Sequence, residues 1–283
     1  TSISNTGRID IGNYSAGTSF SPSRGNAGDY RLGGHVLVVN SGEIHGGVSK
    51  EELAPGEAAF VSGMNVVSLG SNNEYLAGIS HLNELYAGYN EILGEDAFPI
   101  FDYPNVRLYD TTVVNEGRIE LKDGATGIFI VPRAGDSTAI NSGTIIVGDG
   151  TSIPQNNVAS PSAGIFQTNF PVNGLGSTAS INTATGVIVA GDDGAGIRNL
   201  NIGGTSIAIN EGSITVGDGT STRISNYSGE SYDRLFQSSG ITSISAASQV
   251  FGTTAYAGNS GEITAGDLSF GMFVSGQGQR ALQ

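Results

Sequence analysis

The strongest constraint on this chain is a short motif that recurs seven times along it. Residues 139–150 carry one copy, AINSGTIIVGDG, in which Gly follows Asn by two residues and Ile follows it by four. The copy at Asn182 has two extra residues, so its Gly and Ile are Gly186 and Ile188. The motifs begin at Asn5, Asn40, Asn115, Asn141, Asn182, Asn210 and Asn259. Such repetition is typical of solenoids, whose stacked units share one core.

A second mark lies between these motifs, usually a small residue followed by Gly and Ile. Its glycines are Gly17, Gly78, Gly127, Gly164, Gly196, Gly240 and Gly271. In the shortest copies this Gly lies 12 residues after the Asn and 14 before the next Asn, which gives a minimal repeat of 26 residues. Apolar residues alternate within the repeat, as in Ile145 and Val147, and predict three short strands. The pattern predicts an all-β protein, a right-handed three-sided parallel β-helix (β-solenoid) of about seven coils.

Stacking the coils aligns equivalent residues into columns. We expect the Asn residues to occupy a corner, where Asn tolerates left-handed backbone geometry and can pass amide hydrogen bonds from coil to coil. We expect the Ile column to lie in the core, where complete burial of each side chain contributes about 1.5–3 kcal/mol. The Ile column consists of Ile9, Ile44, Ile119, Ile145, Ile188, Ile214 and Ile263. Both columns are interpreted as structural.

Composition narrows the function classes. The formal charge of −14 offers no basic surface for a phosphate backbone, so we expect no nucleic-acid partner. The chain has no Cys, which excludes disulfides and thiolate metal sites. It has neither an apolar run long enough to span a membrane nor a signal-peptide pattern. We therefore interpret it either as a cytoplasmic protein or as the interior of a longer exported chain.

We treat residues 1–283 as a single β-solenoid domain with insertions at about 20–35, 47–77, 82–110, 149–163 and 218–239. Coils 2, 4 and 6 expand the same segment, between the end of the Asn motif and the Gly-Ile mark, so we expect their insertions to emerge from one edge of the rod. Apolar residues at helical spacing between His81 and Leu93 predict one short helix on another edge. Repeat proteins commonly bind partners through such insertions.

Aromatic and acidic residues in these insertions are the candidate ligand contacts. On extended β-surfaces, aromatic rings can stack on sugars while carboxylates accept hydrogen bonds from sugar hydroxyls. The alternative is that the rings pack the long insertion onto the rod. The candidate residues are Tyr75, Tyr86, Tyr89, Phe101, Tyr103, Tyr227 and Tyr232.

Other chemistry has weaker support in the sequence. His35 and His45 flank one Asn motif without an HxxxH pair, and no GxSxG elbow is present. The Gly-Asp-Gly runs at 148–150 and 217–219 supply too few carboxylates for Ca²⁺ and are interpreted as tight turns. We expect no catalytic residue, metal or cofactor. A polysaccharide lyase or hydrolase remains the enzymatic alternative, in which paired carboxylates would act.

The repeated N-x-G-x-I-x-V-G-D-G pattern, followed by A-G-I, resembles the β-helical passenger domains of Gram-negative autotransporters and related large surface adhesins. The resemblance covers nearly the whole chain. It implies an extracellular or bacterial cell-surface location, either outer membrane-anchored or secreted, and a role in adhesion or aggregation. Expected partners are a host-surface glycan or protein, or the same protein on a neighbouring cell. End-to-end self-association into a filament is an alternative.

Overall fold

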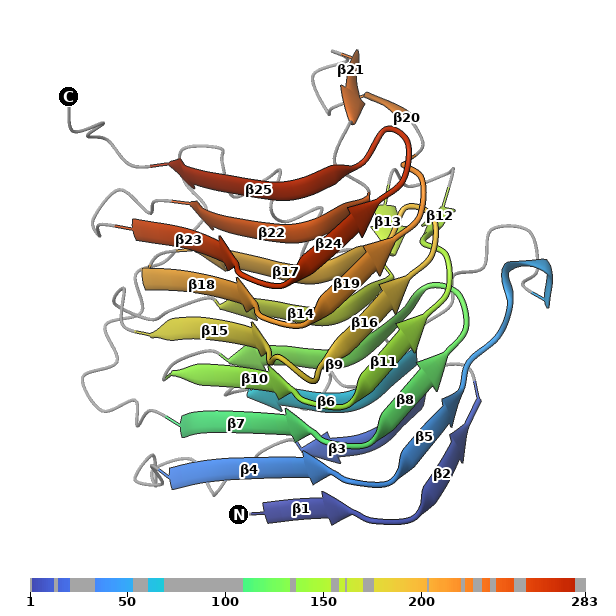
Figure 1. Ribbon diagram of the computed structural model, residues 1–283, viewed down its shortest axis with the longest axis vertical. Coiled ribbons are helices and arrows are strands. Elements are labelled where there is room, and N and C mark those ends of the chain that lie inside the picture. Colours follow the sequence, from blue (N-terminus) through green and yellow to red (C-terminus); the bar gives the residue numbers. More distant parts are fainter. Residues whose placement is uncertain are drawn as a thin grey trace, which may run out of the picture.

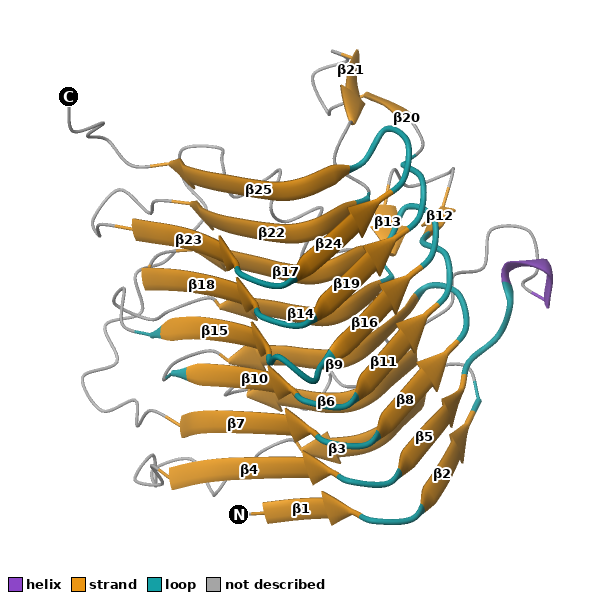
Figure 2. Ribbon diagram, in the orientation of Figure 1, coloured by secondary structure: helices purple, strands orange, loops and turns teal. Residues whose placement is uncertain are grey.

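The chain folds into a stack of three-stranded coils, seen in the computed structural model in Figure 1. The structure describes residues 2–12, 15–20, 34–52, 61–68, 109–132, 136–153, 158–160, 162–169, 176–202, 204–219, 222–225, 231–234, 238–246 and 253–277. In these ranges the only helical element is the 3₁₀ turn η1 (Lys50–Glu52), drawn in purple in Figure 2.

Each coil contributes one strand to each of three parallel sheets. Sheet A contains β1 (Ser2–Asn5), β4 (Gly34–Asn40), β7 (Tyr109–Asn115), β10 (Ser137–Asn141), β15 (Ser177–Asn182), β18 (Gly204–Asn210) and β23 (Thr253–Asn259). Sheet B contains β2 (Arg8–Ile11), β5 (Glu43–Gly46), β8 (Arg118–Leu121), β11 (Thr144–Val147), β16 (Val187–Ala190), β19 (Ser213–Val216) and β24 (Glu262–Ala265). Sheet C contains β3 (Ser15–Phe20), β6 (Val61–Ser68), β9 (Ala125–Pro132), β14 (Ala163–Asn169), β17 (Ala195–Ile202), β22 (Ser239–Ala246) and β25 (Phe270–Gln277). The prediction of a three-sided parallel β-helix of about seven coils is confirmed.

The core is built from identical side chains stacked in register. Ile145 pairs with Ile119 on one side and with Ile188 on the other, and all three are fully buried. In the terminal coils Ile9 and Ile263 are only partly buried, because each has a neighbouring coil on one side only. Burial of each inner Ile is worth about 1.5–3 kcal/mol, which makes this column a main source of stability.

A chain of amide hydrogen bonds runs along the corner between sheets A and B. The Asn141 Nδ2 group donates to Asn182 Oδ1 at 2.8 Å, and Asn141 Oδ1 accepts from Asn115 Nδ2 at 2.8 Å. Similar links join Asn5 to Asn40, Asn40 to Asn115, Asn182 to Asn210 and Asn210 to Asn259. The expectation of left-handed backbone geometry at these residues is wrong, since the described non-glycine residues with positive φ are Asp193 and Leu268. Asn is needed here for its side chain, which is both donor and acceptor.

Two glycine columns exist because neighbouring coils approach too closely for a Cβ atom. At Gly117 and Gly143, in the Asn motif, an added Cβ would collide with the carbonyl oxygen of the matching Gly in the preceding coil. In sheet C, a Cβ at Gly196 would lie 2.6 Å from Gly240 O and would also collide with the Ile214 side chain. These glycines therefore provide space for stacking and for the Ile column.

A column of Asp side chains follows sheet B along the next corner. The backbone N–H of Asp149 donates to Asp123 Oδ1 at 2.8 Å, and the backbone N–H of Asp192 donates to Asp149 Oδ1 at 2.9 Å. The same contact continues to Asp218 and Asp267. The interpretation of the Gly-Asp-Gly runs as turns therefore has a physical basis, because each carboxylate caps the turn of the next coil.

A buried polar seam lies between sheets A and C. Ser137 Oγ donates to Gln167 Oε1 at 2.7 Å, and Gln167 Nε2 donates to Ser180 Oγ at 2.7 Å. Ser180 Oγ in turn donates to Asn199 Oδ1 at 2.7 Å. All four residues are at most 1% exposed. Part of the interior is thus held by hydrogen bonds, which fix how sheets A and C face each other.

Coil 2 differs from the sequence prediction. Its strand in sheet C carries Ser62, Gly63 and Met64, which pair with β3 and β9 in the positions predicted for Ala77, Gly78 and Ile79. Met64 is fully buried where the other inner coils have Ile, so this strand does not carry the Gly-Ile pattern. The first insertion of coil 2 therefore lies between Gly46 and Val61, and the second lies between Ser68 and Tyr109. The predicted insertion at 47–77 was too long, and the predicted helix at 81–93 lies outside the described residues.

Candidate functional site

The insertions of coils 2, 4 and 6 leave the rod at one edge, where each coil passes from sheet B to sheet C. In coil 4 this segment holds an antiparallel hairpin of β12 (Thr151–Ile153) and β13 (Val158–Ser160). In coil 6 it holds a second hairpin of β20 (Thr222–Ser225) and β21 (Ser231–Arg234). In coil 2 it holds η1. Figures 1 and 2 show all three on the same side of the stack.

Most of the predicted contact residues lie outside the part of the chain that the structure describes. This applies to Tyr75, Tyr86, Tyr89, Phe101, Tyr103 and Tyr227. Tyr232 lies in β21, where its backbone pairs with Ile224. The aromatic contact hypothesis therefore stays a prediction.

The outer face of sheet B is a second candidate surface, and its charges are ordered. We call this the sheet B outer face. Two residues of every strand point outward. They stack into two columns along the rod, and the two outward residues of one strand form a row that takes the number of its coil. The first column is Arg8, Glu43, Arg118, Thr144, Val187, Ser213 and Glu262. The second column is Asp10, His45, Glu120, Ile146, Val189, Thr215 and Thr264. Coils 1–3 are charged here, and coils 4 and 5 carry the apolar side chains Ile146, Val187 and Val189.

The charged residues of rows 1–3 form a network of ion pairs, both within rows and between neighbouring rows. Within rows, Arg8 contacts Asp10 at 2.8 Å, His45 contacts Glu43 at 3.2 Å, and Arg118 contacts Glu120 at 2.9 Å. Between rows, Arg8 Nη1 lies 3.7 Å from Glu43 Oε2, and His45 Nδ1 lies 3.6 Å from Glu120 Oε2. This face is therefore a checkerboard of alternating charge whenever His45 is protonated.

The network shifts the pKa values of two of its charged groups, Arg8 and Asp10. The hydrogen bond from Arg8 lowers the pKa of the Asp10 carboxyl, and the same hydrogen bond, with the charge of Asp10, raises the pKa of the Arg8 guanidinium. Near the insertion edge, a hydrogen bond from the Ser49 backbone and a second from Lys122 lower the pKa of Glu52. All three groups are exposed to solvent. Their pairings order the side chains more than they stabilise the fold.

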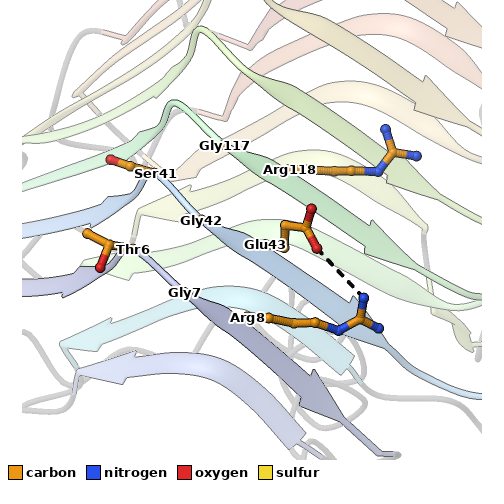
Figure 3. A pocket seen from close by; sticks show the side chains of 8 residues that line it. All are labelled: Thr6, Gly7, Arg8, Ser41, Gly42, Glu43, Gly117 and Arg118. Atoms are coloured by element: carbon orange, nitrogen blue, oxygen red, sulfur yellow. Dashed lines mark ion pairs between the residues drawn. The ribbon is translucent and has the colours of Figure 1, made fainter.

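A shallow hollow of about 500 Å³ lies beside the first column, at the corner between sheets A and B (Figure 3). Its floor is backbone, because Gly7, Gly42 and Gly117 have no side chains. Thr6 and Ser41 form one rim, and Arg8, Glu43 and Arg118 form the other. The hollow offers hydroxyl, guanidinium and carboxylate groups to a polar ligand and is open to solvent.

Across the described ranges, no three His, Asp or Glu side chains converge in an arrangement that would hold a metal ion. The described segments also contain no helix suited to crossing a bilayer.

Sequence reasoning missed the sheet B outer face, although its signal was present. The residue after the motif Gly is Arg8, Glu43 and Arg118 in coils 1–3, an alternation visible once the motifs are aligned. Its meaning depends on stacking of coils far apart in sequence, such as the pairing of Glu43 with Arg118. Comparison of the chain with protein-family models, curated proteins and solved structures finds no match.

Proposed function

We propose that the chain is a cell-surface or secreted β-solenoid with a structural and adhesive role, in which the loops on one edge contact a host glycan, a host protein or another cell. The observation that carries this proposal is the shared position of the insertions. Coils 4 and 6 each replace a tight turn with a hairpin at the same corner, and coil 2 adds η1 there.

The regular rod supports this reading because it holds the insertions at fixed spacing. Adjacent coils are about 4.8 Å apart, so hairpins on alternate coils lie roughly 10 Å apart along the edge. Coil 5 lies between them and closes the same corner with only residues 191–194. The hairpins are thus additions to a coil that does not need them for closure, which is how repeat proteins commonly present binding loops.

Coil 5 also supplies the design for a test. The Gly191–Gly194 turn can replace residues 148–162 in coil 4 and residues 217–238 in coil 6. Far-UV circular dichroism and thermal melting would establish that each graft keeps the solenoid. Binding to glycan arrays and to intact host cells should then fall when both hairpins are replaced, and by less when only one is.

A matched control separates the edge from the rest of the rod. The double substitution Ser213→Ala and Thr215→Ala changes the sheet B outer face and leaves both hairpins in place. Binding that is unchanged by the double graft would overturn the assignment of contact to this edge. We also propose that the chain is not an enzyme, and release of reducing ends or unsaturated sugars from polysaccharides would contradict that.

A further inference from the structure

We infer that the sheet B outer face is self-complementary and pairs two copies of this chain side by side, with their rods parallel. The inference rests on the order of charges across this face and is independent of the proposed contacts at the hairpin edge. The occupant of the face is a second copy of the chain.

Geometry decides which pairing satisfies the charges. When two such faces meet about a two-fold axis parallel to the rod, the first column of one copy lies over the second column of the other, row by row. Arg8 then faces Asp10 of the second copy, and Arg118 faces Glu120. In the row between them, Glu43 faces His45. Opposite charges meet in rows 1 and 3, and an acceptor meets a potential cation in row 2.

Rows 5 and 6 also match in this arrangement, whereas row 4 sets Thr144 against Ile146 and row 7 sets Glu262 against Thr264. Val187 is 36% exposed and would meet Val189 of the second copy, so that row 5 becomes an apolar contact. Row 6 brings hydroxyl groups together through Ser213 and Thr215. No row places like charges together. Because each copy contributes the same surface, the interface is isologous and closes after two copies.

Arrangements in which the two rods run antiparallel make fewer favourable contacts across the face. A two-fold axis that runs along the strands through row 2 would place Arg8 over Arg118 of the second copy and Asp10 over its Glu120. Like charges in contact oppose association. Moving that axis by half a row, to lie between rows 2 and 3, brings Glu43 over Arg118. It also sets the Asp10 carboxylate against the apolar Ile146 side chain, where it loses hydration without gaining a partner.

The size of the face sets the strength of the pairing. Seven strands spaced about 4.8 Å apart, each of four residues, make a surface of roughly 400–450 Å² per copy. Stable protein interfaces bury about 800 Å² per partner, so the pair is expected to be weak in dilute solution. Many copies displayed on one surface would reinforce it by multivalency.

Two charge-reversal variants of the complete chain test the pairing. One carries Arg8→Glu and Arg118→Glu, and the other carries Asp10→Arg and Glu120→Arg. Each variant alone should repel itself in rows 1 and 3 and associate roughly tenfold or more weakly than the unmodified chain. Mixed together, the two variants should associate about as strongly as the unmodified chain does with itself, because every reversed charge then meets its opposite in the parallel register.

The measurement is sedimentation velocity over a concentration series at low ionic strength, supported by clustering of beads coated with each variant and with the mixture. Circular dichroism would show that both variants fold, as expected for substitutions at solvent-facing positions. Association by the separate variants equal to that of the unmodified chain would overturn the inference. So would a mixture that associates no better than its components, which is also the result expected for the shifted antiparallel register.

Discussion

Replacement of Asn141 by Ala tests how much the amide ladder contributes to stability. Asn141 is fully buried and links coils 3, 4 and 5. The substitution removes the acceptor of Asn115 Nδ2 and the donor to Asn182 Oδ1, and it deletes bonds to Gly143 O at 3.2 Å and Val187 O at 3.3 Å. A buried polar group left without its partner costs about 1–3 kcal/mol. Asn115 Nδ2 keeps contacts with Gly117 O at 3.4 Å and Thr144 O at 3.3 Å, so the main loss is the donor to buried Asn182 Oδ1, and the free energy of unfolding should fall by about 1–3 kcal/mol.

The last residue of the ladder is the matched control. Asn259 is exposed at the end of the described stack, accepts from Asn210 Nδ2 at 2.7 Å and donates only a 3.3 Å bond to Gly261 O. Asn210 Nδ2 keeps contacts with Gly212 O and Glu262 O when Asn259 is removed. Asn259→Ala should therefore lower the free energy of unfolding by only about 0.5–1.5 kcal/mol.

Urea unfolding followed by far-UV circular dichroism gives both values, and hydrogen exchange resolved along the chain locates the loss. Repeat proteins open in units of neighbouring repeats, so Asn141→Ala should increase exchange most in coils 3–5. Equal destabilisation by the two substitutions would refute the argument that continuity of the ladder stabilises the rod. Uniform exchange along the chain would refute its local character.

Three further predictions follow from other columns. Gly196→Ala should lower the free energy of unfolding by about 1–3 kcal/mol through overpacking against Ile214 and Gly240 O, whereas Gly271→Ala, with no atom within 4 Å of an added Cβ, should be nearly neutral in urea unfolding. Asp192→Ala removes the acceptor of the Asp218 backbone N–H and should destabilise the rod by about 0.5–1.5 kcal/mol in the same assay. Asp192→Asn keeps an acceptor oxygen and should destabilise the rod less. The reverse order would contradict the conclusion that the Asp192 side chain caps the turn of the next coil. Because the folded-state pKa of Asp10 is lowered, its contribution to stability is complete above the ordinary Asp value of about 3.9 and is lost as the pH falls through the lowered value. A carboxyl NMR titration should place its midpoint below about 3.9 and return it toward that value in Arg8→Gln; a midpoint that does not move would exclude Arg8 as the cause.

Much of the coil was predictable because a solenoid repeats its physical requirements. Each coil must supply an apolar residue to the same column, so Ile recurs four positions after Asn, apart from the two-residue expansion at Asn182. The prediction was wrong where another side chain meets the same requirement. Met64 fills the core position that was assigned to Ile79, since a flexible apolar side chain of similar size packs there equally well.

The charged outer face was not predicted because its order exists only between coils. Glu43 and Arg118 are 75 residues apart in the sequence, and only the register of β5 against β8 makes them neighbours. The insertion between Ser68 and Tyr109 separates those coils in sequence without separating them in the stack. Loop length therefore hides a surface pattern that depends on stacking alone.

The sequence by itself determined the period, the three strands of a coil and the identity of the Asn, Gly and Ile columns, because these are local requirements that every coil repeats. Only the tertiary structure decided which of two Gly marks closes coil 2, that the Asp residues cap the next turn, and that a buried seam of Ser, Gln and Asn joins sheets A and C. It alone also brought the charged side chains of coils 1–3 together on one face of the rod. These features depend on contacts between coils, whose separation in sequence varies while their separation in space does not.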